Sequence, residues 1–116
     1  MRKRGGSGPN PWEVWWANLD PARGHEQRGR RPVIVIGSAL ACSLPNGLAI
    51  VIPTTTALFP VPYRVQVSLV RERASFAMCE QVKSISVDRL EALDACRTIP
   101  GPERLAVRFA VQQMLF

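Results

Sequence analysis

The amino-acid sequence predicts a mainly β protein: a small, strongly curved antiparallel β-barrel with one C-terminal α-helix. Short segments rich in aromatic and β-branched residues recur along the chain between turn-forming residues, which is typical of strands. A single segment, at the C-terminal end, has the apolar spacing of an amphipathic helix. Short strands joined by irregular loops must close on themselves or cover their edges, and this favours a barrel. A chain of 116 residues is long enough for one core and too short for two, so we expect a single domain at 11–116. The basic residues 1–10 before it are expected to form a flexible tail.

The first three strands are expected at 12–19, 33–36 and 48–52. The first mixes aromatic and aliphatic residues, and the other two are short apolar runs that suit strands covered on both faces. Between the second and third strands, Ser38 to Asn46 forms a connection with one helical turn. Pro53 has no N–H to donate to a ladder, so we expect the third strand to end there.

Two further strands are expected at 63–69 and 74–79, and the segment 82–85 either continues the second of these or forms a neighbouring strand, so five to seven strands are expected in all. In the first of these, apolar residues at 63, 65 and 67 alternate with Arg64 and Gln66, which is the period of a strand with one covered face. After the last strand, Ser86 is placed to cap a single helical turn that runs through Leu90.

The C-terminal helix is expected to begin at Gly101, because Pro102 suits a first helical turn, where a missing N–H costs nothing. Arg104, Arg108 and Gln112 recur every four residues and mark one polar side. Apolar residues cover most of the remaining helix surface, which is more than packing on one sheet requires. We therefore expect the helix to bury a second surface, as in a contact between subunits.

The composition indicates the kind of partner and compartment. A net charge of +6 and a pI near 10.3 favour a polyanionic partner, usually nucleic acid, although a merely basic surface is an equal alternative. No apolar run reaches the roughly 18 residues of a membrane span, and no apolar signal segment follows the basic N-terminus. Cys42, Cys79 and Cys96 match no zinc or disulfide pattern, so we expect reduced cysteines and a cytoplasmic location.

The connection from Gly24 to Pro32 holds more ionisable chemistry than a turn needs. It contains His25, Glu26 and Gln27, and the arginines in and beside it are Arg23, Arg28, Arg30 and Arg31. RNA can be cleaved without a metal ion because its 2′-hydroxyl is an internal nucleophile, so the protein supplies a base, an acid and positive charge. His25 or Glu26 could move protons, and the planar donor fork of Arg31 could hold a phosphate.

The same residues could instead have purely structural roles. His25 suits an exposed loop, and Glu26 could pair with a neighbouring arginine. Arg31 and Gln27 could bond backbone carbonyls, and the threonines at 54–56 could end a strand with hydroxyl-to-backbone bonds. The nine carboxylates form no close cluster of the kind that binds catalytic metals, and no glycine-rich phosphate loop or G-x-S-x-G elbow is present. No metal site is predicted.

Several blocks, taken together and in order, resemble the MazF/PemK (Kid) family of toxin–antitoxin endoribonucleases. They are "NLDP", "GHEQ", "RP", "IPTTT" and "QVKSI", and the resemblance extends over roughly residues 11–116. It implies a Src-homology-3-like barrel, shared with the gyrase poison CcdB, and a homodimer. It implies metal-independent, cofactor-free cleavage of single-stranded RNA at short sequences, leaving 2′,3′-cyclic phosphate and 5′-hydroxyl ends. It also implies a cognate MazE-like antitoxin that occupies the RNA groove.

The same resemblance implies the site residues. The catalytic ones are Arg31, just before the motif's proline, Thr55, two places after Pro53, and the loop pair His25 and Glu26. Those expected to contact RNA are Arg23, Gln27, Arg28, Arg30, Thr54, Thr56, Glu80 and Gln81. From the chemistry we prefer Arg31 as a stabiliser of phosphate charge and Glu26 or His25 as the proton carrier, because arginine is a poor acid at neutral pH.

Two departures from the family pattern occur in one block. Met78 stands where the PemK-like branch has a catalytic arginine, which the MazF-like branch lacks, and Glu80 stands where aspartate is usual. A catalytically weakened relative is therefore one alternative. The other is a non-catalytic protein, either a CcdB-like gyrase-binding toxin or a small RNA-binding barrel, neither of which needs Arg31 opposite Thr55.

Aromatic residues near the motifs offer faces on which unpaired bases could stack. They are Trp15, Trp16 and Tyr63. Strand alternation places Trp15 and Trp16 on opposite faces, so at most one of them is expected on the RNA side, and the other is expected in the core.

Overall fold

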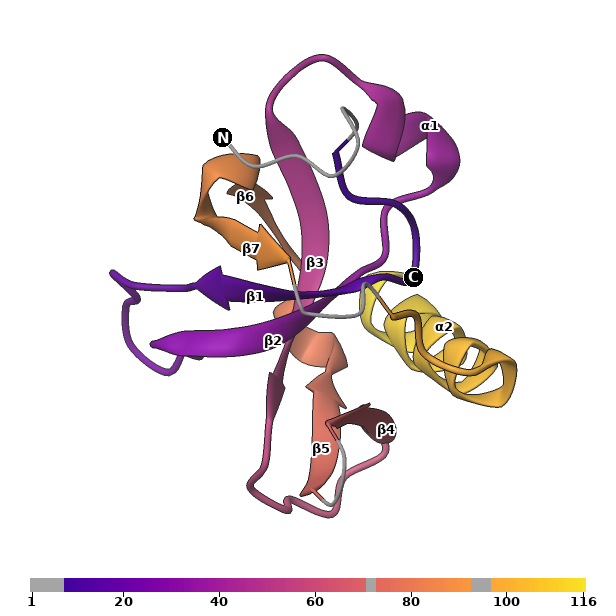
Figure 1. Ribbon diagram of the computed structural model, residues 1–116. Helices are drawn as coiled ribbons and strands as arrows, with labels where there is room; N and C mark the ends of the chain where they lie inside the picture. Colours follow the sequence, from indigo (N-terminus) through magenta and orange to yellow (C-terminus); the bar gives the residue numbers. More distant parts are fainter. Residues whose placement is uncertain (1–7, 71–72, 93–96) are drawn as a thin grey trace.

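The computed structural model describes residues 8–70, 73–92 and 97–116, and in them seven strands and two α-helices (Figure 1). The strands are β1 (Val14–Asn18), β2 (Arg30–Val35), β3 (Leu48–Thr55), β4 (Arg64–Val70), β5 (Arg73–Met78), β6 (Lys83–Ser86) and β7 (Leu90–Ala92). The α-helices are α1 (Ala39–Ser43) and α2 (Gly101–Leu115). Two short 3₁₀ helices are also present, η1 (Cys79–Gln81) and η2 (Val87–Arg89). Within 1–10, the expected tail, residues 1–7 lie outside the described residues.

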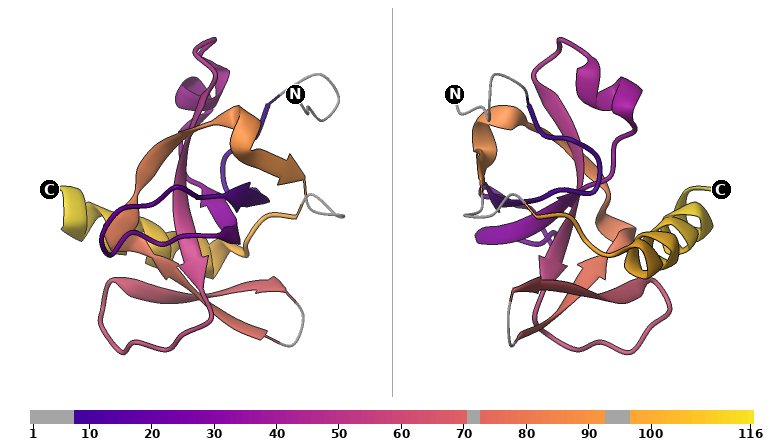
Figure 2. Two further views of the ribbon diagram at one scale, coloured as in Figure 1. Left: turned by 90° about the vertical axis from the view of Figure 1, so that its left-hand side faces the viewer. Right: turned by 45° about the vertical axis from the view of Figure 1, so that its right-hand side comes forward.

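The strands form one antiparallel sheet in the order β4-β5-β3-β2-β1-β7, with β6 paired to β3. The predicted mainly β architecture with a C-terminal helix is confirmed. Strand pairing in the described residues does not close into a complete barrel, because β4 and β7 remain at the two ends of the order. Strand β3 runs through the middle of the molecule and joins the β4–β5 hairpin to the other strands (Figures 1 and 2).

The expectation that Pro53 ends a strand is wrong, because β3 continues through it to Thr55. The Ile36 N–H donates to the Ile50 carbonyl at 3.0 Å, so Ile50 and every second residue after it in β3 direct their backbone groups toward β2. An N–H at position 53 would therefore point to the other side of β3, away from β2. On that other side β6 pairs with β3 only as far as Val51, and β5 begins pairing at Thr54. The missing N–H of Pro53 therefore falls where β3 changes partner, and no ladder bond is lost.

A second expectation also needs correction, at the end of the sheet. Ser86 caps a turn as predicted, since its hydroxyl accepts a hydrogen bond from the Asp88 N–H at 3.2 Å. That turn ends at Arg89, and Leu90 begins strand β7, which pairs with β1 and which we did not predict. A three-residue strand is too short to show a period, so only its partner β1 reveals it.

The core lies on both faces of the sheet, as the wholly apolar segments predicted. One cluster packs β1, β2, β3, β4 and β5 against α2 and contains Ile34, Ile52 and Val107. The other lies on the opposite face and contains Trp15, Val33 and Leu90. Consecutive residues of β2 thus enter different clusters, which holds this strand rigidly on both sides.

Helix α2 buries little of its surface against the sheet. Its buried residues are Val107 and Ala110. Several large apolar side chains of the helix remain exposed, among them Leu105 (67%), Phe109 (65%) and Leu115 (58%). The wide apolar face predicted from the sequence is therefore present and uncovered in the single chain.

The cysteines described by the structure are thiols. Cys42 is half-buried and Cys79 is buried, and neither forms a disulfide. Burial, with a smaller effect of the Glu80 charge, raises the pKa of Cys79 to about 12, so this thiol stays protonated at neutral pH. Cys96 lies outside the described residues.

Candidate active site

The connection between β1 and β2 is a closed loop pinned at its base. The Leu19 N–H donates to the Gly29 carbonyl at 2.9 Å, and the Gly29 N–H donates to Asp20 Oδ1 at 3.1 Å. Gly24 and Gly29 have φ values of 59° and 84°, which side-chain-bearing residues rarely adopt. The sequence can therefore bend the chain sharply at both places and present the residues between them to solvent.

The tip of this loop is stabilised by its own residues. A Glu26 carboxylate oxygen accepts a hydrogen bond from the Arg23 backbone N–H at 2.6 Å, and Arg28 Nη2 donates to the Gly24 carbonyl at 3.3 Å. Glu26 therefore bonds a neighbouring arginine through its backbone rather than by an ion pair. Both Glu26 and His25 are exposed, so both are open to solvent and to a ligand.

Arg31 is held at the start of β2 by two groups of the loop. Its Nε donates to the Arg28 carbonyl at 3.0 Å. The Gln27 side-chain oxygen, in the amide orientation that satisfies both of its ends, accepts from Arg31 Nε at 2.7 Å and from Nη1 at 3.1 Å. The structural role considered for Arg31, a bond to a backbone carbonyl, is therefore real. It leaves Nη2 available and fixes the guanidinium plane.

The threonines of β3 lie beside Arg31. Val33 pairs with Pro53, and continuing this register places Arg31 across from Thr55 and Pro32 across from Thr54. The Thr54 hydroxyl confirms the alignment, because it donates to the Pro32 carbonyl at 2.7 Å. The Thr55 hydroxyl accepts from the Ala57 N–H at 3.1 Å, which leaves its own proton free to donate.

A cavity of about 260 Å³ opens where these strand ends meet. It is lined by Trp16, Arg30, Arg31, Pro32, Thr54, Thr55, Thr56 and Ser75. Cationic and hydroxyl groups therefore surround a space next to Arg31 and Thr55. Such donors can surround a phosphate diester, because they supply positive charge and hydrogen bonds at the same place.

The two neighbouring tryptophans face opposite sides of β1, as predicted. Trp15 is 2% exposed, and its indole Nε1 donates to Glu13 Oε1 at 2.9 Å, so it belongs to the core. Trp16 is half-buried and lines the cavity. The Arg30 guanidinium lies 4.4 Å from the Trp16 ring centre and pairs with Glu91 at 2.8 Å, which orients a flat surface beside the cavity.

Glu80 is engaged with Arg64, which sequence reasoning did not single out. Arg64 Nε donates to both Glu80 carboxylate oxygens, at 3.1 and 3.0 Å. Partial burial acts to raise the pKa of Glu80, but the hydrogen bonds and charge of Arg64 outweigh it and the pKa lies below its usual value. Met78, directly across from Arg64 in the β4–β5 pairing, is 4% exposed and therefore belongs to the core.

This pair predicts an acid-dependent change in stability. Because the folded-state pKa of Glu80 is depressed, the stabilisation is present above the usual carboxyl pKa and is lost as pH falls through the lower folded value. We expect the wild type to be more stable than Glu80→Gln near neutral pH, and the difference to shrink below about pH 4. Urea unfolding of both proteins across pH measures it. A difference that grows on acidification would contradict the pairing.

The structure brings together some of the predicted site residues and separates others. Those lining the cavity are Arg30, Arg31, Thr54, Thr55 and Thr56. Gln27 and Gln81 meet in a hydrogen bond of 2.8 Å, from the Gln27 backbone N–H to Gln81 Oε1. The loop-tip residues do not line the cavity; they are Arg23, His25, Glu26 and Arg28. Ser75 lines the cavity but was not predicted, because a serine in a strand carries no distinguishing sequence signal.

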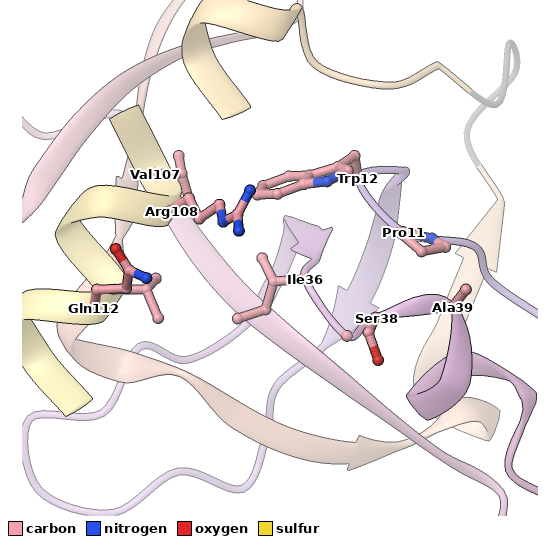
Figure 3. A pocket seen from close by; sticks show the side chains of 10 residues that line it. Pro11, Trp12, Ile36, Ser38, Ala39, Val107, Arg108 and Gln112 are labelled. Atoms are coloured by element: carbon pink, nitrogen blue, oxygen red, sulfur yellow. The ribbon is translucent and has the colours of Figure 1, made fainter. Parts of the chain in front are cut away.

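A larger cavity, of about 450 Å³, lies away from this site between α2 and the residues around β2 (Figure 3). Trp12, Ile36 and Val107 form its apolar wall, and Arg108 and Gln112 stand at its helix side. None of the residues predicted to act on RNA lines it. Of the two cavities, the smaller one at the strand ends is therefore the one that contains predicted site residues, including Arg31 and Thr55.

Within the described residues, no group of three or more histidine, cysteine, aspartate or glutamate side chains could hold a metal ion. None of the described helices combines the length and the apolar character needed to cross a membrane. The family of the chain follows from comparison with known proteins.

Residues 10–115 match the sequence pattern of the PemK-like, MazF-like toxins of type II toxin–antitoxin systems. The chain belongs to this family. Endoribonuclease MazF9 of Mycobacterium tuberculosis is 35% identical over 86 residues, which cover 67% of this chain and 73% of the relative. The endoribonuclease toxin MazF of Escherichia coli is 35% identical over 78 residues, which cover 67% of this chain and 68% of the relative. The resemblance inferred from the motifs is therefore confirmed.

Solved structures share the fold of this MazF-like toxin. MazF from Deinococcus radiodurans superimposes with a TM-score of 0.80 at 24% identity, covering 93% of this chain and 96% of that one. A MazE–MazF complex from the same organism has a TM-score of 0.71 at 20% identity, covering 93% and 95%. At these identities the likeness establishes the fold, including the MazF arrangement of sheet and C-terminal helix.

Proposed function

We propose that this MazF-like toxin is a metal-independent endoribonuclease. It cleaves single-stranded RNA at short sequences and leaves 2′,3′-cyclic phosphate and 5′-hydroxyl ends. The observation that carries the proposal is the cavity that Arg31 and Thr55 line together from the adjacent strands β2 and β3, with Arg31 directly following the ionisable β1–β2 loop. The relatives that are about 35% identical are themselves endoribonucleases.

The chemistry follows from the groups at the cavity. The 2′-hydroxyl of the substrate attacks its own phosphorus, so negative charge builds up on the non-bridging oxygens. Arg31 donates to those oxygens from a guanidinium plane that Gln27 and the Arg28 carbonyl already hold, and Thr55 adds a hydroxyl donor. Glu26 or His25, carried on the exposed loop tip, removes the 2′-hydroxyl proton and returns one to the leaving 5′-oxygen.

Cleavage is expected to continue in EDTA, because the internal nucleophile and Arg31 supply what a metal ion would otherwise provide. The measurement incubates the purified protein with a long single-stranded RNA, with EDTA or with magnesium, and identifies the fragment ends. Loss of cleavage in EDTA that magnesium restores would overturn the metal-free mechanism. An RNA that stays intact under both conditions would instead favour the non-catalytic alternative.

The proposal includes a homodimer and a cognate antitoxin. The exposed apolar face of α2 and the basic surface of a chain with net charge +6 both favour a covering partner. The dimer buries the helix face, and an acidic MazE-like antitoxin covers the basic RNA groove. Proteins of this fold have been solved as MazE–MazF complexes, which supports the second partner. We place the protein in the cytoplasm, where its RNA substrate is found.

A further inference from the structure

The base of the β1–β2 loop is held by Arg89, whose Nη1 donates to the Asp20 carbonyl at 3.0 Å, and the tip of the loop is attached to the rest of the sheet through Gln27. Among the described residues, in the amide orientation that bonds Arg31, only Gln27 of positions 21–28 has a hydrogen bond to an element beyond β2, and this bond is made by its backbone N–H. The other bonds of this segment are made within the loop or to the adjacent Arg31. The position of the loop tip therefore depends on what holds Gln27.

The group that holds Gln27 comes from η1, 54 positions along the chain. Gln81 Oε1 accepts the Gln27 backbone N–H at 2.8 Å. Gln81 Nε2 in turn lies 3.5 Å from Glu80 Oε2, which completes a polar chain to the Arg64–Glu80 pair. Because Glu80 is already held by a guanidinium and Gln81 is half-buried, the accepting oxygen is held in a defined place.

Gln27 transmits this attachment to Arg31. Its backbone is bonded to Gln81, while its side-chain oxygen accepts from Arg31 Nε and Nη1. Displacing the Gln27 backbone would move that oxygen and free the guanidinium to rotate. The result would be a cavity with the correct residues and a poorly aimed arginine, and misplacement by about 1 Å can cost on the order of 100-fold in rate.

We propose that Gln81 is a positioning residue for RNA cleavage: it fixes the β1–β2 loop through the Gln27 backbone and thereby aims Arg31. This inference rests on the proposed function. It replaces the expectation that Gln81 contacts RNA with a role inside the protein. The side-chain oxygen of Gln81 is used by Gln27, and its amide nitrogen faces Glu80.

The test compares Gln81→Met with the control Gln66→Met. Methionine has nearly the shape of glutamine but provides no strong acceptor, and Gln66 is an exposed residue of β4. For Gln81→Met we expect single-turnover cleavage to fall about tenfold, the loss that one hydrogen bond typically causes. Binding of an uncleavable RNA with a 2′-deoxy sugar at the cleavage site should change less than about twofold, since the basic residues remain. Gln66→Met should match the wild type in both.

Two further variants separate positioning from direct RNA contact. Gln81→Glu keeps an acceptor for the Gln27 N–H, so hydrogen-exchange protection of that amide should survive in it and be lost in Gln81→Met. In an Arg31→Ala background, Gln81→Met should slow cleavage little further, because the two residues act as a unit. The proposal would be overturned if Gln81→Met slowed cleavage by the same factor with and without Arg31→Ala. It would also be overturned if Gln81→Met reduced RNA binding as much as it reduced cleavage.

The amide measurement does not depend on activity. If the protein cleaves no RNA, the proposed function fails, while protection of the Gln27 amide still shows whether Gln81 holds the loop. If cleavage is normal in Gln81→Met although the amide has lost protection, the positioning role fails and the endoribonuclease proposal stands. Thermal unfolding of each variant identifies a general loss of structure, which would lower protection in β3 and β5 as well.

Discussion

Replacing Arg31 by alanine is expected to slow RNA cleavage by on the order of 100- to 1000-fold, the loss that follows removal of one preorganised donor to a developing oxyanion. Arg31→Lys should also cleave much more slowly, because it keeps the charge but loses the planar fork that Gln27 and the Arg28 carbonyl orient. RNA affinity should fall far less, since other arginines still supply salt-dependent attraction. Single-turnover cleavage and binding of uncleavable RNA are measured for the wild type and both variants.

Arg28→Ala is the matched control for Arg31. Arg28 belongs to the same loop and carries the same charge, but it does not line the cavity, and among the described residues its side chain bonds the Gly24 carbonyl alone. It should weaken binding modestly and leave the cleavage rate of bound RNA near that of the wild type. If Arg31→Ala loses binding and cleavage in equal proportion, Arg31 holds RNA and does not stabilise the transition state. If it changes neither, the assignment of the site is wrong.

Introducing a charge into the exposed face of α2 is expected to separate the proposed dimer. Leu105 is 67% exposed, so Leu105→Asp costs the isolated fold little, but it would place an unpaired carboxylate in a subunit interface. We expect the dissociation constant to rise about 100-fold or more, which corresponds to the loss of a strong interface contact. Light scattering over a concentration series measures the effect, and circular dichroism verifies the fold.

Leu40→Asp is the control for this experiment, because Leu40 is 73% exposed and lies on α1 rather than on α2. The same chemical change at a similar exposure should leave the dimer intact. A wild-type protein that is monomeric at micromolar concentration would contradict the dimer. A dimer that dissociates with Leu40→Asp and not with Leu105→Asp would place the interface on another surface.

Local patterns predicted most of the elements, and their errors have a common cause. The helix at the C-terminus follows from its apolar spacing and from Pro102, and the opposite placement of Trp15 and Trp16 follows from strand alternation alone. The errors at Pro53 and at Leu90 both concern pairing with a distant strand. A proline interrupts a ladder only if its N–H would face a partner, and a three-residue strand exists only because a partner is beside it.

The family, the sheet with its C-terminal helix, and the ionisable residues of the β1–β2 loop follow from the amino-acid sequence alone, because each depends on residue types and their spacing along the chain. Which of these residues meet depends on how the whole chain folds. The register of β2 against β3 sets Arg31 across from Thr55, and the fold brings Gln81 to the backbone of Gln27. The fold also places Glu80 where its carboxylate accepts hydrogen bonds from Arg64. Contacts between distant segments are selected by the packing of the whole core, so no local pattern records them.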